Sequence, residues 1–222
     1  DIGNKQTDMN YYPPETTIIT FDLHKVLVTH DYYRMFQLWW RSQQRLALVL
    51  YLSNPKVLWR VFRLRQSGAV AEKVLMSLIA EFPHFQRFRK LGIEILNAQK
   101  PIPESLACLQ ELKKQRYSLH IFSNIGEQLY QHLQLQHPEL FNLFDVVHTT
   151  KQYNNYLAKP HKQAFLDYLS EHNLANNQVI FIDDKSKNIA AAQQCGIIGI
   201  KFKSPANLKQ VISRLTSNLK PL

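Results

Sequence analysis

The sequence predicts an α/β fold in which helices cover both faces of a parallel sheet, with a long all-helical segment inserted after the first strand. From residue 103 onward, short apolar runs alternate with helical patterns, which is typical of a parallel sheet. Between residues 30 and 99 the pattern is helical throughout, and no strand is expected there. The core therefore comprises residues 17–29 and 100–222, the insertion spans 30–99, and residues 1–16 form a polar arm.

The first elements follow from local signals. A nearly continuous apolar and β-branched run over 17–22 predicts a buried strand, and a short turn region follows at 24–29. Asn54-Pro55 is typical of a helix N-cap followed by a first-turn proline, and Ser67-Gly68 and Pro83 interrupt the pattern again. The insertion is therefore expected to contain four helices, at 31–52, 55–66, 69–81 and 84–98.

The second half of the chain alternates regularly. Gly196 stands where a helix end favours left-handed backbone, and Ser204-Pro205 can open the last helix. The expected strands are 117–123, 145–149, 179–183 and 199–202, a polar loop is expected at 150–158, and the expected helices are 103–115, 126–136, 160–172, 186–195 and 205–218.

Composition excludes some classes of protein. No uncharged apolar run approaches the roughly 18–20 residues of a membrane span. The first residues are polar and lack the apolar core of a signal peptide. The chain has only two cysteines, Cys108 and Cys195, so we expect no disulfide framework and a reducing, cytoplasmic environment.

The positive charge is concentrated in the insertion. The formal net charge is +10, and residues 30–100 contain 12 Lys/Arg against 4 Asp/Glu. Such a field attracts anions. Phosphorylated metabolites, nucleic acid and acidic membranes all fit; we favour a small phosphorylated substrate, and charge alone does not decide.

Polar side chains end the predicted strands. Asp22, Ser123-Asn124, Thr149-Thr150 and Asp183-Asp184 should meet at one edge of the sheet, where ligands bind in such folds. The clustered carboxylates would repel one another without a cation between them. Mg²⁺ bound by Asp22 and Asp184 would reduce this repulsion. With a phosphate ester present, Asp22 could attack phosphorus while the metal, Lys159 and the Ser123 hydroxyl hold its oxygens.

Four segments carry a family resemblance. They are Phe21–Leu27 (FDLHKVL), Phe122–Asn124 (FSN), Ala158–Pro160 (AKP) and Phe181–Asn188 (FIDDKSKN). In this order they resemble the four motifs of the haloacid dehalogenase-like hydrolase superfamily, over roughly residues 17–203. The helical insertion resembles the cap of the phosphoglycolate phosphatase-like subfamily.

The resemblance implies a Rossmann-like core and a Mg²⁺-dependent phosphatase that works through an aspartyl-phosphate on Asp22. It implies metal ligation by Asp22, Asp184 and the backbone carbonyl of His24, with Asp183 in support. The candidate catalytic residues are Asp22, His24, Ser123 and Lys159, and the candidate substrate-binding residues are Ser123, Asn124 and Lys159.

One position departs from the family pattern. Phosphatases of this family carry a second aspartate two residues after the nucleophile, as the acid that protonates the leaving group, whereas this chain has His24. Histidine can act as a general acid near neutral pH, although like charge disfavours an imidazolium beside Mg²⁺. The alternative is therefore a catalytically weak regulatory protein that holds an anionic partner on its basic insertion. A metal-free carbon–halogen hydrolase is a third hypothesis, and the Asp183-Asp184 pair argues against it.

The insertion also contains aromatic and basic clusters. Tyr32, Tyr33, Phe36, Trp39 and Trp40 recur near helical spacing, which predicts core or the seam between insertion and core, with a role in substrate specificity for one or two of them as the alternative. The cluster Arg41, Arg45, Arg60, Arg63 and Arg65 predicts a solvated face, with a phosphate- or lipid-facing patch as the alternative. Residues 46–52 beside them could lie in a membrane interface.

Overall fold

The computed structural model describes residues 11–66, 71–151 and 157–216. Several predictions fall on the remaining residues and so lie outside the described part of the chain. They concern most of the polar arm, the start of the 69–81 helix, the middle of the 150–158 loop and the end of the last helix.

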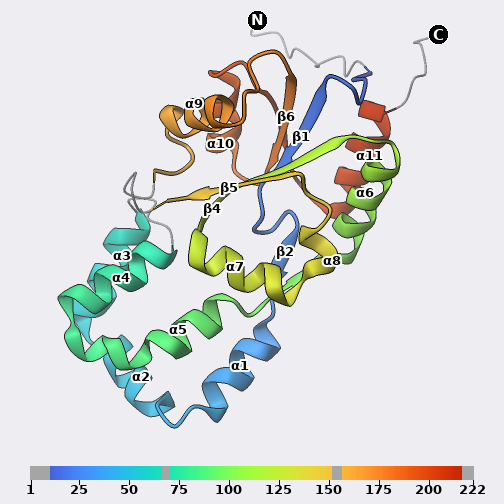
Figure 1. Cartoon of the computed structure of the whole chain (residues 1–222). Coiled ribbons are helices and arrows are strands. Elements are labelled where there is room, and N and C mark those ends of the chain that lie inside the picture. Colours follow the sequence, from blue (N-terminus) through green and yellow to red (C-terminus); the bar gives the residue numbers. More distant parts are fainter. Residues whose placement is uncertain (1–10, 67–70, 152–156, 217–222) are drawn as a thin grey trace, which may run out of the picture.

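A five-stranded parallel sheet forms the centre of the fold, in the order β5-β4-β1-β6-β7 (Figure 1). The strand at its middle, β1, pairs with β4 on one side and β6 on the other. The predicted α/β class is confirmed, and the core is Rossmann-like. The strands are β1 Thr17–Phe21, β4 Ser118–Gly126, β5 Val146–Thr150, β6 Gln178–Asp183 and β7 Ile198–Lys201.

Helices cover both faces of the sheet because side chains alternate along each strand. In β1, Ile19 and Phe21 join a core with helices on one face, while Ile18 joins a second core on the other. The first face carries α6 Pro103–Lys114, α7 Glu127–Gln136, α8 Pro138–Phe141 and α11 Pro205–Thr216; the second carries α9 Lys162–Glu171 and α10 Ser186–Gln193 (Figure 1). The predicted left-handed backbone at Gly196 is confirmed, with φ of 78°.

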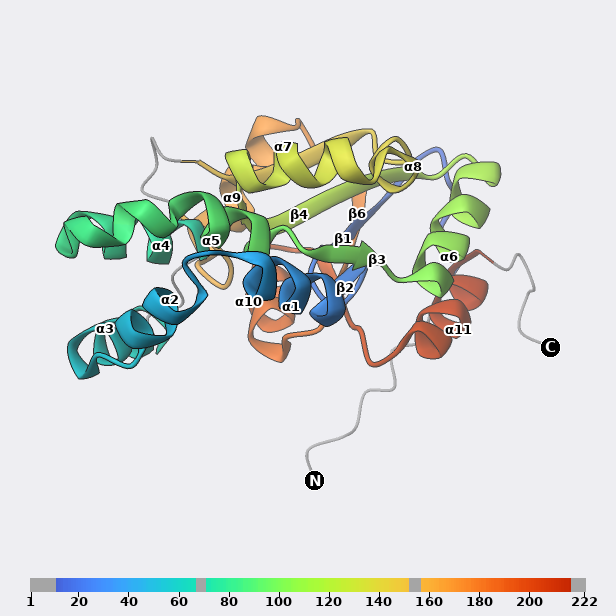
Figure 2. The ribbon, with the colours of Figure 1, turned by 90° about the horizontal axis from the view of Figure 1, so that it is seen from below.

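The insertion leaves and rejoins the core through a short antiparallel ribbon made of β2 Val28–His30 and β3 Gln99–Pro101. Between these strands lie α1 Tyr32–Arg41, α2 Arg45–Leu52, α3 Pro55–Gln66, α4 Ala71–Glu81, the 3₁₀ helix η1 Pro83–Phe88 and α5 Arg89–Leu96. Figure 2 shows α1, α2 and α3 along one side of the insertion and α4 and α5 along the other. None of the helices in the described residues is both long and apolar enough to cross a bilayer.

The prediction of one helix over 31–52 is wrong. The chain breaks at Ser42, whose backbone is extended with φ of −69° and ψ of 126°. The Ser42 hydroxyl accepts a hydrogen bond from the Gln44 N–H at 3.1 Å, an alternative to helical bonding that serine side chains favour. The result is two short helices in place of one.

Other boundaries also differ from the prediction. The expected helix at 84–98 begins as the 3₁₀ helix η1 and ends before Asn97. The ribbon strands β2 and β3 and the short helix α8 were not expected, since three or four residues are too few to show a periodic pattern.

A buried polar network joins α9 to the sheet. The Tyr168 hydroxyl lies 2.7 Å from the Thr20 hydroxyl and 2.9 Å from Nδ1 of His120. In the next strand, Nδ1 of His148 lies 3.3 Å from Nε2 of His172. Burial lowers the pKa of both His120 and His148 to about 4, so both rings are neutral at pH 7. For His120, the Asp145 carboxylate opposes this shift; for His148, the Glu171 carboxylate does.

We expect this network to make the fold sensitive to acid. Between pH 6.5 and pH 4 the unfolded chain binds protons that the folded His120 and His148 do not, so the free energy of unfolding falls as pH falls. Linkage predicts a loss of about 3 kcal/mol at pH 4 for each ring, because a histidine with a pKa of 6.5 in the unfolded chain is fully protonated there while the buried ring is only half protonated. Urea unfolding measured across this pH range checks the prediction.

The control is His148→Phe, which keeps a ring beside Phe122 and removes one titrating group. Its unfolding free energy should depend less steeply on pH between 6.5 and 4 than that of the wild type. Equal slopes for the two proteins would contradict the prediction.

Candidate active site

The predicted site residues converge at the carboxyl edge of the sheet. Asp22 directly follows β1, Asp183 and Asp184 stand at the end of β6, and Ser123 lies in β4. These positions follow from the chain itself, because parallel strands end at the same edge. A cavity of about 430 Å³ opens there, and Asp22, His24, Ser123, Asn124, Lys159 and Asp184 all line it.

Lys159 binds two of the carboxylates. Its Nζ lies 2.9 Å from Oδ1 of Asp22 and 2.9 Å from Oδ2 of Asp183, and it also donates to the backbone carbonyl of Phe122. The side chain of Lys159 is only 1% exposed. A buried ammonium between two buried carboxylates compensates one of their two negative charges, and in the low dielectric of this position the remaining negative charge favours a further cation.

Asn124 holds the segment that presents Lys159. Its Nδ2 donates to the carbonyl of Lys159 at 2.7 Å, and its Oδ1 accepts from the Lys159 N–H at 2.9 Å. The whole amide is thus used to join the end of β4 to the loop before α9.

The two adjacent aspartates differ in their surroundings. Asp183 is fully buried, and its oxygens accept hydrogen bonds from Lys159, from the Lys185 N–H at 2.7 Å and from Nδ2 of Asn188 at 2.8 Å. Asp184 lines the cavity, and its Oδ1 is buried with no hydrogen-bond partner among the described residues. Burial, then the charges of Asp22 and Asp183, raise the pKa of Asp184.

The donor set fits a hard divalent cation. Asp22, Asp183 and Asp184 each offer a carboxylate oxygen, and these atoms lie within 4.8 Å of one another. The raised pKa of Asp184 means that its charged form is disfavoured here, and its Oδ1 has no hydrogen-bond partner among the described residues. A bound cation would stabilise the charged form. Oxygen-only ligands suit Mg²⁺. Because the oxygens of Asp183 already accept hydrogen bonds from protein groups, Asp22 and Asp184 are the carboxylates best placed to hold the ion.

The hydroxyl of Ser123 marks a second place that fits a ligand. Ser123 is fully buried from solvent, and its Oγ has no hydrogen-bond partner among the described residues. A buried hydroxyl without a partner is costly, so a ligand oxygen that accepts from it would gain binding energy.

His24 lies at the cavity in the turn that follows Asp22. Burial lowers the pKa of His24 below 6.5; the Asp22 carboxylate opposes the shift, while His30, Lys185 and Lys159 increase it. The next residue, Lys25, has φ of 66°, a left-handed conformation that glycine adopts more easily. Its Nζ lies 3.9 Å from Oδ2 of Asp184.

Sequence reasoning missed part of the site. Lys185 and Lys187 also line the cavity, and with Lys25 they give its mouth a positive charge. The sequence feature that could have identified these lysines is their position directly after the Asp183-Asp184 pair. Asn188, which donates a hydrogen bond to Asp183, could have been identified in the same way, because it lies on the first turn of α10 shortly after the pair. Thr149 and Thr150 bond instead to Glu127 and to the carbonyl of Ile125.

Comparison with known families identifies the class of protein to which this Rossmann-like core and its aspartate-rich site belong. The model of the family named haloacid dehalogenase-like hydrolase matches residues 64–201. The chain belongs to this family.

A curated relative is a phosphatase. The sesquiterpene phosphatase astK of Aspergillus oryzae is 28% identical over 101 residues, which are 46% of this chain and 50% of the relative. The matched part thus spans about half the length of that protein.

Solved structures share the fold at low sequence identity. YfnB from Bacillus subtilis, a haloacid dehalogenase-type hydrolase bound to magnesium, has a TM-score of 0.62 at 13% identity, with 91% of this chain and 99% of that chain covered. A family enzyme of Bacteroides thetaiotaomicron in complex with magnesium and inorganic phosphate has 0.59 at 18%, with 85% and 95% covered. The L-2-haloacid dehalogenase of Xanthobacter autotrophicus has 0.58 at 15%, with 92% and 84% covered.

Proposed function

We propose that this chain is a Mg²⁺-dependent phosphatase that hydrolyses a phosphate monoester through an aspartyl-phosphate on Asp22. Four residues that line the cavity carry a buried oxygen with no hydrogen-bond partner among the described residues: Gln99, Ser123, Asp184 and Asn188. The proposal is carried by two of these oxygens, which share the cavity with Asp22: Oγ of Ser123 and Oδ1 of Asp184. The first suits a phosphate oxygen and the second suits a cation. The relation to a sesquiterpene phosphatase supports the same reaction class.

The chain's own residues suffice to place the reacting groups. Lys159 holds Oδ1 of Asp22 and so orients the carboxylate for attack by its other oxygen on phosphorus. A bond forms from this oxygen to phosphorus as the bond from phosphorus to the leaving oxygen breaks. The Ser123 hydroxyl donates to a phosphoryl oxygen. All three protons of the Lys159 ammonium are used by Asp22, Asp183 and the Phe122 carbonyl, so Lys159 contributes its positive charge beside the phosphoryl group. Asp22 and Asp184 would hold Mg²⁺, which would supply further positive charge there. Water then hydrolyses the acyl phosphate and restores Asp22.

Two further residues act by positioning. Asn124 fixes the backbone of Lys159, and Asp183 fixes the Lys159 ammonium together with the first turn of α10. Asn124 was expected to bind substrate, and the use of its amide inside the protein favours the positioning role.

The leaving oxygen needs a proton, and His24 is the proposed donor. Its lowered pKa means that only a minor fraction of His24 is protonated at pH 7 in the absence of ligands. This observation also favours the second candidate function, a weakly catalytic protein that binds an anionic ligand in the same cavity. The two candidates differ in the turnover of the wild-type protein and in its response to His24→Asp.

We expect phosphate release to depend on Mg²⁺. The assay uses a panel of small phosphate monoesters and one terpenyl monophosphate, with wild type and His24→Asp, in chelator and after Mg²⁺ is restored. Turnover should be lost in chelator and return with Mg²⁺, whereas NaCl at equal ionic strength should not restore it. Removal of the bound cation by the chelator should lower the rate of phosphate release by about a hundredfold or more.

The other outcomes are equally informative. An inert wild type together with an active His24→Asp variant would show an intact scaffold that has become a binding protein. Hydrolysis of a haloacid that persists in chelator would contradict the phosphatase proposal and favour a metal-free dehalogenase.

A further inference from the structure

Helix α1 presents an unpacked aromatic face. No residue of α1 is buried, and Tyr32, Tyr33, Phe36 and Trp40 are 72%, 73%, 54% and 56% exposed. Positions separated by three, four or seven residues share one face of a helix, so these rings lie together. The expectation that they form core or the seam is wrong for these four residues.

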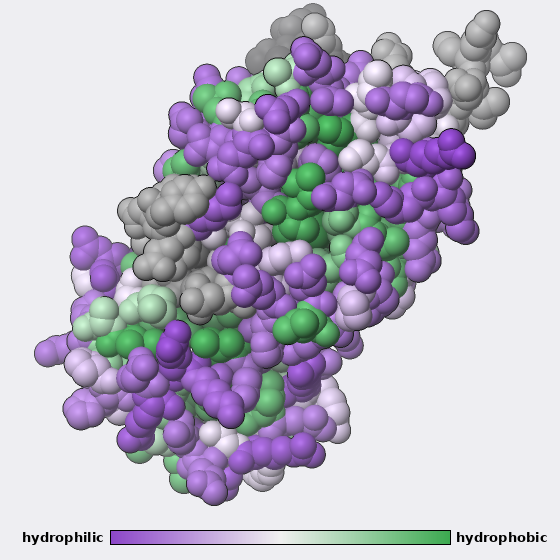
Figure 3. All heavy atoms as spheres, viewed as in Figure 1, coloured by the Kyte–Doolittle hydropathy of each residue, from purple (hydrophilic) through white to green (hydrophobic). Residues whose placement is uncertain are grey.

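Exposed apolar side chains continue along α2 and α3. No residue of α2 is buried, although most of its residues are apolar. Single exposed apolar side chains are ordinary, whereas a group of them on consecutive helices marks an interaction site. We call this group the exposed apolar surface; it consists of Tyr32, Tyr33, Phe36, Trp40, Leu46, Val49, Leu50, Leu58, Trp59 and Phe62. Its helices lie on one side of the insertion (Figure 2), and Figure 3 shows apolar side chains of the insertion reaching the surface among hydrophilic ones.

Basic groups accompany the exposed apolar surface. Residues 31–66 contain seven Lys/Arg and one Asp/Glu, Asp31. The guanidinium of Arg45 lies 5.4 Å from the ring centre of Trp40, and that of Arg63 lies 5.1 Å from the ring centre of Trp59. The charges are thus placed against the exposed rings themselves.

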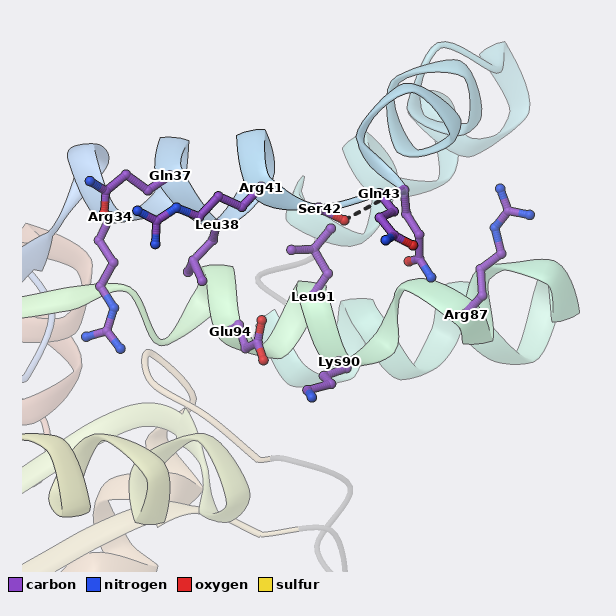
Figure 4. A pocket seen from close by; sticks show the side chains of 11 residues that line it. Arg34, Gln37, Leu38, Arg41, Ser42, Gln43, Arg87, Lys90, Leu91 and Glu94 are labelled. Atoms are coloured by element: carbon purple, nitrogen blue, oxygen red, sulfur yellow. Dashed lines mark hydrogen bonds between the residues drawn. The ribbon is translucent and has the colours of Figure 1, made fainter.

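A basic groove lies on the side of α1 that faces α5. A cavity of about 650 Å³ lies between α1 and α5, and its charged lining is Arg34, Arg41, Arg87, Lys90 and Glu94. Leu38 of α1 and Leu91 of α5 point toward one another in it, with the charged groups around them (Figure 4). This groove offers several cationic donors to an anion such as a phosphodiester.

We propose that the exposed apolar surface, together with the arginines that lie over its rings, binds the interface of an anionic lipid bilayer. Tryptophan and tyrosine favour the headgroup level of a bilayer, aliphatic side chains enter the acyl boundary, and arginines bind anionic headgroups. All three kinds of side chain occur together here. The inference concerns the insertion alone and holds whether or not the cavity at the sheet edge turns over phosphate esters.

Charge and composition select this occupant over two others. A symmetric contact with a second copy would bring two surfaces of like positive charge together, which is unfavourable. Nucleic acid would satisfy the arginines and stack on the aromatic rings, but it offers nothing to Leu46, Val49, Leu50 and Leu58. Of these three, the anionic bilayer is the one that provides partners for the charged, aromatic and aliphatic side chains at once.

The chain carries its own reporter for this test. All three tryptophans, Trp39, Trp40 and Trp59, lie in α1 and α3. Tryptophan emission of the full chain should shift to shorter wavelength with vesicles of equimolar phosphatidylcholine and phosphatidylglycerol, and lipids brominated on the acyl chain should quench it. Vesicles of phosphatidylcholine alone should produce neither effect at the same lipid concentration.

Substitutions that spare the tryptophans localise the contact. The double variant Leu50→Gln/Phe62→Gln should sediment with anionic vesicles roughly tenfold more weakly than the wild type. Leu135→Gln is the matched control, because Leu135 is 82% exposed on α7, outside the insertion. Arg63→Glu should weaken binding by roughly fivefold or more, while Lys114→Glu on α6 should leave it unchanged.

Four results would overturn the proposal. The first is unchanged tryptophan emission with anionic vesicles, and the second is wild-type sedimentation of the Leu50→Gln/Phe62→Gln variant. The third is a dimer, seen by analytical ultracentrifugation, that this variant dissociates, which would assign the surface to a second copy. The fourth is a single-stranded oligonucleotide that changes the tryptophan emission as strongly as the vesicles do, which would assign it to nucleic acid.

Discussion

Replacing Asp22 with asparagine should abolish phosphate release while leaving the fold intact. The amide is nearly the same size as the carboxylate but is not nucleophilic, so the covalent route is lost. We expect the turnover number to fall by about a thousandfold or more, the scale seen when a nucleophile is removed. Steady-state phosphate release in saturating Mg²⁺ measures the effect.

Two controls separate chemistry from structure in this experiment. Far-ultraviolet circular dichroism should be the same for both proteins. A substitution outside the cavity, Glu104→Gln on α6, should retain wild-type turnover. Full activity of Asp22→Asn would show that Asp22 is not the nucleophile and would defeat the proposed function.

The largest effect on stability is expected from Lys159→Met. The substitution removes the ammonium that lies between Asp22 and Asp183 and leaves two buried carboxylates without their cation. Removing one partner of a buried ion pair costs about 3–5 kcal/mol, mainly because the remaining charge stays desolvated. Urea denaturation at pH 7 in chelator measures the change in the free energy of unfolding.

The matched control is Lys113→Met. Lys113 also forms an ion pair, at 2.8 Å from Asp145, but the side chains are 30% and 45% exposed. Exposed pairs contribute at most about 1 kcal/mol, so this variant should unfold close to the wild type. A Lys159→Met protein as stable as Lys113→Met would show that the buried carboxylates are compensated in another way.

The candidate site was largely predictable from the sequence because strand ends fix its position. A buried β-branched run before Asp22 and another before Asp183 place both carboxylates at one edge of a parallel sheet. Lys159 was different, since it lies on a loop where periodicity gives no information, and only its neighbours Ala158 and Pro160 suggested its place. That it would contact both aspartates could be learned only from the structure.

The insertion was predicted less well, for a physical reason. Helical spacing shows that Tyr32, Phe36 and Trp40 share a face, but spacing does not show what covers that face. In a single chain the default covering is the core, and here it is solvent. The break at Ser42 was missed for a similar reason, because one side-chain hydrogen bond outweighs the helical preference of the flanking residues.

The β2–β3 ribbon has an evolutionary consequence. Because His30 lies opposite Gln99, the chain departs from the core and returns to it at a single point. The residues between them form an inserted segment whose two ends lie side by side. Its length and sequence can therefore change without altering the strand order of the central sheet. The ribbon therefore makes the molecule modular: the sheet that carries the aspartates and the inserted helices can diverge separately, provided that the few contacts outside the ribbon, such as that of Arg34 with Gln136, are kept or replaced.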